Sequence, residues 1–268
     1  MNKNLAPKLL LLIWIAGAMI SCQKPATPAP DFESHFRENQ VHGGFLLYDM
    51  KGDQYFEWNS PRLDSAYLPA STFKVFNSLV ALEEKAVEDE NEIFPWDSLP
   101  KRVESWNRPH SLRSAIEVSA VWFYQEVARR AGQDRMQHWI DTVGYGNRDI
   151  SGGIDMFWLN GGLRITAREQ VAFLQRIYHN DLPFSQRSID ILKDIMIREK
   201  GEDYVLRHKT GWADLPDPDT GWLVGWLEKQ GNVWFFAMNI DIRKDEDAKA
   251  RLAITKAVLS DVSGVTFD

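Results

Sequence analysis

Cysteine is nearly absent from this sequence, with Cys22 as the single one among 268 residues. An intrachain disulfide is therefore impossible. The histidines, at positions 35, 42, 110, 138, 179 and 208, show no paired spacing typical of zinc ligands, and we expect no metal. Acidic and basic residues are interspersed around a formal charge of -7, so no basic stripe favours a nucleic acid. With 44% hydrophobic residues, the chain is long enough to bury a substantial core in one domain or two closely joined ones.

The first 30 residues predict an export signal and a tether. Lys3 and Lys8 precede an apolar run at 9–16 and small residues, a pattern typical of a signal peptide. Residues 17–22 resemble a bacterial lipobox ending at Cys22, with Met19 where Leu is usual. We expect residues 1–22 to direct export to the periplasm and Cys22 to be lipidated; an ordinary signal peptide and an uncleaved anchor remain alternatives. The proline-rich residues 23–30 predict an extended tether, and 31–268 the folded domain.

The apolar periodicity predicts strands at both ends of the folded domain and helices between them. A hairpin is expected at 41–48 and 54–58, and three later strands at 204–209, 221–227 and 233–242. Helices are expected at 71–86, 112–118, 121–131, 135–142, 167–178, 188–197 and 247–259. This order predicts an α+β fold, in which one antiparallel sheet is flanked by helices and joined to a mainly helical lobe.

Ser71 and Lys74 form the most informative short motif. Ser-x-x-Lys begins at positions 21, 71 and 98, but only Ser71 opens a helical pattern, with apolar residues at 75, 79, 82 and 86. Residues three apart lie on the same helix face, which puts the Lys amine within reach of the Ser hydroxyl. A neutral amine there would accept the hydroxyl proton. Taken alone, the tetrad is better explained by a Ser N-cap followed by a surface Lys.

Three downstream motifs make the catalytic interpretation of Ser71 and Lys74 more specific: Ser119-Ala120-Val121, Tyr145-Gly146-Asn147 and Lys209-Thr210-Gly211-Trp212. Each has a structural alternative, namely a helix N-cap at 119, a helix stop at 145–147, and a strand that leaves its sheet through a Gly turn at 211. Together with the tetrad, and in this order, they resemble the penicillin-recognising serine enzymes, whose signature is S-x-x-K, S-D-N and K-T-G.

The variant residues indicate one branch of that superfamily. Val121 stands where S-D-N has Asn, and Met156 stands where class A β-lactamases carry a catalytic Glu, with Asp155 one position out of register. When Phe157-Trp158-Leu159 is taken together with the four motifs above, the chain resembles the class D (oxacillinase-type) β-lactamases from about residue 43 to about residue 259. The resemblance implies that 31–268 is a β-lactamase catalytic domain.

The resemblance also implies a mechanism. Ser71 would form an acyl-enzyme with a β-lactam, and Lys74 would be N-carboxylated by carbon dioxide and act as general base in both acylation and deacylation. Trp158 would donate its indole N–H to that carboxylate; its alternative role is a core aromatic. Ser119 would pass a proton between Lys74, Lys209 and the departing nitrogen. No cofactor other than carbon dioxide or bicarbonate is implied.

The remaining site residues are assigned to substrate binding: Val121, Thr210, Gly211, Trp212, Arg251 and Trp106. Lys209 and Thr210 would supply donors to a carboxylate, Gly211 would let substrate lie against the strand, and the Trp212 N–H would join that of Ser71 at the oxyanion. Arg251 matches the family's carboxylate-binding Arg, with a solvated helix face as its alternative. Trp106 matches a cleft-edge aromatic, with ordinary packing as its alternative.

Two other functions fit the same motifs. A β-lactam sensor domain would acylate without turnover, and a penicillin-binding D,D-peptidase would act on peptidoglycan, although Ser-x-Val argues against the latter. We favour the hydrolase, with a small-molecule β-lactam as substrate, no nucleic-acid partner, and membrane contact only through an N-terminal lipid anchor; no oligomeric state is predicted. The loop at 215–219 is expected to influence the substrate spectrum.

Overall fold

The computed structural model describes residues 27–215 and 217–267. Its centre is a six-stranded antiparallel sheet of order β2-β1-β6-β5-β4-β3. The strands are β1 (Gly43–Asp49), β2 (Gln54–Trp58), β3 (Ile197–Lys200), β4 (Tyr204–Ala213), β5 (Asp219–Lys229) and β6 (Asn232–Ile242). The predicted α+β class, with one antiparallel sheet, is confirmed.

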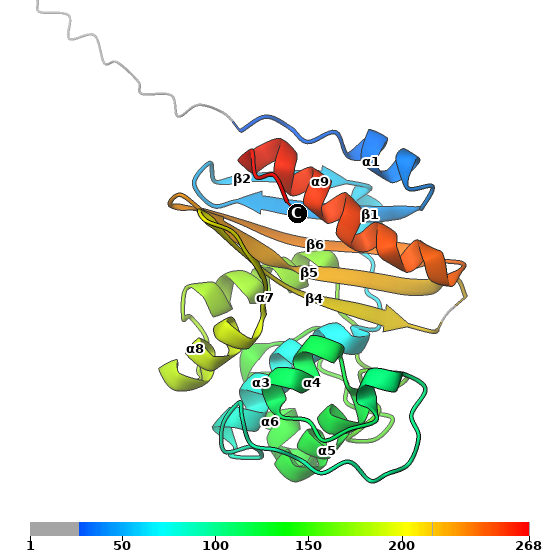
Figure 1. The fold of residues 1–268 in the computed structure, drawn as a ribbon, viewed down its shortest axis with the longest axis vertical. Coiled ribbons are helices and arrows are strands. Elements are labelled where there is room, and N and C mark those ends of the chain that lie inside the picture. Colours follow the sequence, from blue (N-terminus) through cyan, green and yellow to red (C-terminus); the bar gives the residue numbers. More distant parts are fainter. Residues whose placement is uncertain (1–26, 216, 268) are drawn as a thin grey trace, which may run out of the picture.

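Helices cover both faces of the sheet and build a separate lobe (Figure 1). α1 (Phe32–Glu38) and α9 (Ala250–Ser263) lie against one face, and α7 (Ala167–Tyr178) lies against the other. The lobe contains α3 (Lys74–Glu83), α4 (Leu112–Val118), α5 (Val121–Ala131), α6 (Gln133–Val143) and α8 (Gln186–Ile195). Shorter elements are α2 (Ser60–Leu63) and the 3-10 turns η1 (Ala70–Phe73), η2 (Glu104–Trp106) and η3 (Asp245–Lys249).

Strand β5 shows why the sheet needs helices on both sides. Side chains alternate between the two faces of a strand. Leu223 and Leu227 join the apolar cluster under α1 and α9, whereas Trp222, Val224 and Trp226 join the cluster that continues into the helical lobe. All five are buried, so the strand lacks a polar face and its position in the middle of the sheet follows.

Several element boundaries differ from those predicted. The helix expected at 188–197 ends at Ile195, and residues 197–200 form β3, which the sequence did not predict. Helix α1 was also not predicted; Asp31 caps its N-terminus by accepting from Ser34 N. The helix expected at 71–86 is η1 followed by α3. Strand β4 continues through Gly211 to Ala213, so the alternative in which the chain leaves the sheet at Gly211 is wrong.

The predicted export signal at 1–22, including Cys22, lies outside the described residues, as do residues 23–26 of the predicted tether. The described part of the tether contacts the sheet, where Thr27 Oγ1 donates a hydrogen bond to the buried Asp49 carboxylate. Within residues 27–215 and 217–267, no helix combines the length and apolar character needed to cross a membrane.

Candidate active site

A cleft of about 760 Å³ opens where β4 faces the helical lobe. Eight of the residues predicted for the site line it: Ser71, Trp106, Ser119, Val121, Thr210, Gly211, Trp212 and Arg251. The other three, Lys74, Trp158 and Lys209, are buried. These residues come from η1, α3, η2, α5, β4 and α9 and from the segments that carry Ser119 and Trp158, and they span 180 positions of sequence.

The predicted nucleophile and base are in contact. Ser71 lies in η1, whose N-terminal cap is Pro69, and Lys74 is the first residue of α3. Lys74 Nζ lies 2.6 Å from Ser71 Oγ. Lys74 is fully buried, and this burial lowers the pKa of its amine to about 7, because removal from water disfavours the ammonium form. A substantial neutral fraction is therefore available at physiological pH, as a general base requires.

Tyr124 is a neighbour of Lys74 that the sequence prediction missed. Lys74 Nζ lies 5.4 Å from the centre of the Tyr124 ring, whose hydroxyl is 2.8 Å from Ser78 Oγ. Burial raises the pKa of Tyr124 far above its ordinary value, so this phenol stays neutral. Its position three residues after Val121 on α5 was the available signal, since residues three apart share a helix face.

Trp158 combines a packed ring with an unpartnered donor. Its ring stacks on Phe73 at a centroid distance of 5.2 Å, and its carbonyl oxygen accepts from Ala70 N at 3.0 Å. Trp158 Nε1 is buried and has no hydrogen-bond partner among the described residues. An unsatisfied buried N–H is costly. The core packing that we gave as the alternative is thus present, and the N–H is left for an acceptor.

Ser119 connects the cleft to the second buried lysine. It is the C-cap of α4 with φ 60°, and Ala120 is the N-cap of α5, so the alternative of Ser119 as a helix N-cap is wrong. Lys209 Nζ lies 3.0 Å from Ser119 Oγ and 3.0 Å from Thr210 O. Burial, followed by the nearby charges of Lys74 and two arginines, holds the pKa of Lys209 well below its usual range.

The edge of β4 is open where it borders the cleft. β3 pairs only with residues 205–207 of β4, and the next outward N–H, that of His208, bonds to Met196 O. Backbone groups alternate in direction along a strand, so the N–H groups of Thr210 and Trp212 also point out of the edge. A Cβ on Gly211 would lie 2.9 Å from Pro69 O, so glycine lets β4 approach η1 closely.

Arg251 lies at the wall of the cleft, on the first turn of α9. Arg251 Nη1 donates to Gly211 O at 2.5 Å, and the guanidinium lies 5.8 Å from the centre of the Trp212 ring. Burial lowers the pKa of Arg251 to about 10. The alternative of a solvated helix face is wrong for this residue. Trp212 Nε1 donates to Asp219 Oδ2 at 2.7 Å, a contact that the sequence did not predict.

Trp106 and the Tyr145-Gly146-Asn147 motif have visible structural roles. Trp106 Nε1 donates to Val118 O at 2.9 Å, so its packing role is real, and the residue also lines the cleft. Asn147 Nδ2 donates to Gly162 O at 2.9 Å, and Asn147 Oδ1 accepts from Arg164 N at 2.9 Å. The motif ends α6 and ties the following turn in place, as the helix-stop alternative predicts.

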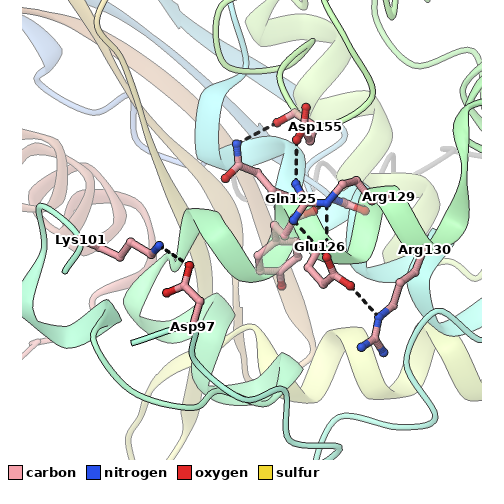
Figure 2. A network of polar contacts seen from close by, with 9 residues as sticks. Asp97, Lys101, Gln125, Glu126, Arg129, Arg130 and Asp155 are labelled. Atoms are coloured by element: carbon pink, nitrogen blue, oxygen red, sulfur yellow. Dashed lines mark hydrogen bonds and ion pairs between the residues drawn. The ribbon is translucent and has the colours of Figure 1, made fainter. Parts of the chain in front are cut away.

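Asp155 is the carboxylate nearest in sequence to Met156, which stands where class A β-lactamases carry a catalytic Glu, and it is bound to an arginine. Asp155 accepts a hydrogen bond from Arg129 Nη1, on α5, at 2.7 Å, and Figure 2 shows this contact. Met156, not a carboxylate, lines the cleft. Within the described ranges, no group of three or more His, Cys, Asp or Glu side chains is placed to hold a metal ion.

Comparison with known proteins agrees with this arrangement. Residues 32–262 match the penicillin binding protein transpeptidase domain. The chain is 46% identical to β-lactamase OXA-48 of Klebsiella pneumoniae, over 85% of this chain and 86% of that protein. It is 44% identical to the probable β-lactamase YbxI of Bacillus subtilis, over 78% and 77% respectively.

Solved structures give the same family. The class D β-lactamase YbXI from Nostoc is 45% identical and superposes with a TM-score of 0.86, over 88% of this chain and all of that one. The class D β-lactamase FUS-1 from Fusobacterium nucleatum is 36% identical with a TM-score of 0.85, over 88% and 98%. The resemblance drawn from the motifs is confirmed, and the chain belongs to the class D β-lactamases.

Proposed function

We propose that this β-lactamase hydrolyses its substrates through an acyl-enzyme on Ser71, with N-carboxylated Lys74 as the general base. The observation that carries the proposal is the 2.6 Å contact between Ser71 Oγ and a fully buried amine. A surface lysine would be an ammonium and unable to accept a proton at neutral pH. Burial of Lys74 removes that obstacle.

The surroundings of Lys74 fit a carboxylate on its amine. A neutral amine is the form that reacts with carbon dioxide, and Trp158 supplies a buried N–H without a partner. When present, the carboxylate would supply a base for both half-reactions, the role that Met156 and the Arg129-bound Asp155 are unable to fill. Trp158 would donate to it, and Phe73 would hold the indole ring in place.

The other cleft residues handle the charges that develop during acylation. The outward N–H of Trp212 and the N–H of Ser71, in the first turn of η1, would bind the oxyanion. Ser119, in contact with Lys209, would deliver a proton to the departing β-lactam nitrogen. Arg251 and Thr210 would bind the substrate carboxylate.

Steady-state kinetics with a chromogenic cephalosporin, in bicarbonate-depleted and bicarbonate-supplemented buffer, test this mechanism. Turnover is expected to rise when bicarbonate is restored. Lys74→Ala should lose turnover, and any acylation that survives should accumulate as acyl-enzyme detectable by mass spectrometry. Full turnover by Lys74→Ala would exclude Lys74 as the base. A stoichiometric burst from the wild-type protein without turnover would instead favour the sensor function.

We further propose that the protein is exported and held at the membrane through Cys22. The supporting features are the apolar run at 9–16 and the lipobox-like residues 17–22. Expression of the full chain and of Cys22→Ser in a Gram-negative host tests this. The full chain should fractionate with membranes and the variant should not; identical fractionation would refute lipid anchoring at Cys22.

A further inference from the structure

Helix α5 holds the turn of chain that carries Trp158. Gln125 Nε2 donates to Asp155 O and to Met156 Sδ, both at 3.2 Å. One helical turn further on, Arg129 Nη1 donates to Asp155 Oδ2 at 2.7 Å. Figure 2 shows the two α5 side chains reaching Asp155 together. Residues four apart share a helix face, so α5 contacts this segment along one continuous side.

These contacts matter because the segment from 153 to 160 has only turns of its own. Its internal bonds are short-range, such as Phe157 N to Gly153 O at 3.0 Å and Leu159 N to Met156 O at 2.8 Å. On the far side of the segment, Trp158 O accepts from Ala70 N at 3.0 Å. The backbone around the indole is therefore held by two elements. Ala70 in η1 binds the carbonyl of Trp158 itself, and α5 binds Asp155, three residues before it.

We propose that Gln125 and Arg129 are positioning residues that stabilise the carboxylated form of Lys74 by holding Trp158 in place. The inference rests on the carboxylation of Lys74 under the proposed function. Trp158 Nε1 is an unpartnered donor, and its hydrogen bond to a group on Lys74 depends on the direction of the indole. Anchoring Asp155 and Met156 restricts the backbone two and three residues before Trp158. Neither positioning residue needs to touch the substrate.

The expected effect is local. The Arg129 and Asp155 side chains are 46% and 31% exposed, and exposed ion pairs contribute little to global stability. Removing a partner that orients a ligating group, by contrast, commonly weakens binding of the held group about tenfold or more. Variants of this contact should therefore fold normally and carboxylate less readily.

The test uses Asp155→Ala and Gln125→Leu, with Asp194→Ala as the matched control. Arg113 is 43% exposed and bonds to Asp194 at 2.6 Å and to Glu90 at 3.3 Å. Arg129 makes the corresponding pair of contacts, to Asp155 and, at 3.0 Å, to Glu126. The control removes an ion pair of similar length between α4 and α8, in which the Asp194 side chain is 55% exposed. No hydrogen bond among the described residues joins this ion pair to the 153–160 segment.

Carboxylation is measured directly, by the ¹³C resonance of the Lys74 carbamate as labelled bicarbonate is titrated into each protein. Asp155→Ala and Gln125→Leu should need about tenfold more bicarbonate for half-carboxylation than wild type. Asp194→Ala should titrate like wild type. Thermal unfolding should shift equally in Asp155→Ala and Asp194→Ala. Arg129→Lys, which keeps a donor to Asp155, should need about as much bicarbonate for half-carboxylation as wild type. If Asp155→Ala fails to fold, Gln125→Leu tests the same positioning role.

Coincident titrations of wild type, Asp155→Ala and Gln125→Leu would overturn the positioning role while leaving the proposed mechanism intact. An equal weakening in Asp194→Ala would also overturn it, because the effect would then be one of general stability. Absence of any carbamate resonance in the wild-type protein would refute the proposed carboxylation itself, and the positioning role with it.

Discussion

Burial of Lys74 should give the protein a measurable dependence of stability on pH, and Lys74→Met isolates it. Methionine fills a similar volume and carries no charge. Burial lowers the pKa of Lys74 from 10.5 to about 7, whereas in the unfolded chain it returns to the higher value. Between those two pH values the unfolded state binds more protons, so the free energy of unfolding of the wild type rises with pH. Over the full window the rise amounts to about 5 kcal/mol.

The assay is urea unfolding of both proteins between pH 6 and 10, in buffer depleted of bicarbonate so that the amine stays free. Titrating groups that do not interact with Lys74 are common to both proteins and cancel in the difference. Lys209 does not cancel, because the charge of Lys74 lowers its pKa, and it contributes to the same difference. Lys74→Met should exceed the wild type in stability most at low pH, and the gap should close steadily above about pH 7. Parallel stability curves across this range would refute the claim that the folded protein holds Lys74 with a lowered pKa.

Three further substitutions test other parts of the site and fold. Trp158→Phe keeps the ring on Phe73 and removes Nε1; thermal stability should change little, while kcat in low bicarbonate should fall about tenfold or more. Asp219→Ala frees the Trp212 indole beside Arg251 and should raise KM several-fold with kcat nearly unchanged, whereas Asp219→Asn, which keeps an acceptor, should resemble wild type in the same kinetic assay. Gly225→Ala places a Cβ 2.0 Å from Arg207 O on the neighbouring strand and should lower the free energy of unfolding by about 1–3 kcal/mol or more, measured in urea. A wild-type kcat in low bicarbonate for Trp158→Phe, a wild-type KM for Asp219→Ala, or a wild-type free energy of unfolding for Gly225→Ala would contradict the corresponding contact.

The nucleophile and base were predictable because their relation is local. Ser71 and Lys74 are three residues apart on one continuous helical stretch, and spacing alone brings their side chains together. The family resemblance supplied the rest of the predicted site, and eight of its residues line one cleft. The Tyr145-Gly146-Asn147 motif is not among the residues that line it. Spacing did not predict that η1 is a 3-10 turn. The apolar pattern at 75–86 is the same whether the preceding residues form a 3-10 turn or the first turn of an α-helix.

The contacts that sequence missed are those made across the fold. Gln125 and Asp155 are 30 residues apart, and nothing in either local pattern indicates that α5 lies against the Trp158 turn. Strand β3 was mistaken for the end of a helix because Ile197 continues the apolar periodicity of α8. Its pairing with residues 205–207 of β4 makes it a strand, an instance of tertiary contacts overriding local preference.

The two buried lysines suggest why carboxylation of one would serve both. Burial lowers the pKa of Lys209, and the charge of Lys74 lowers it further. Two ammonium groups in one desolvated cleft repel each other, so the unmodified site favours neutral amines. A negative charge on Lys74 reverses that effect and raises the proton affinity of Lys209. Lys209 Nζ is 3.0 Å from Ser119 Oγ. The same modification that supplies a base beside Ser71 would therefore charge the lysine next to Ser119, the residue proposed to deliver a proton to the departing nitrogen.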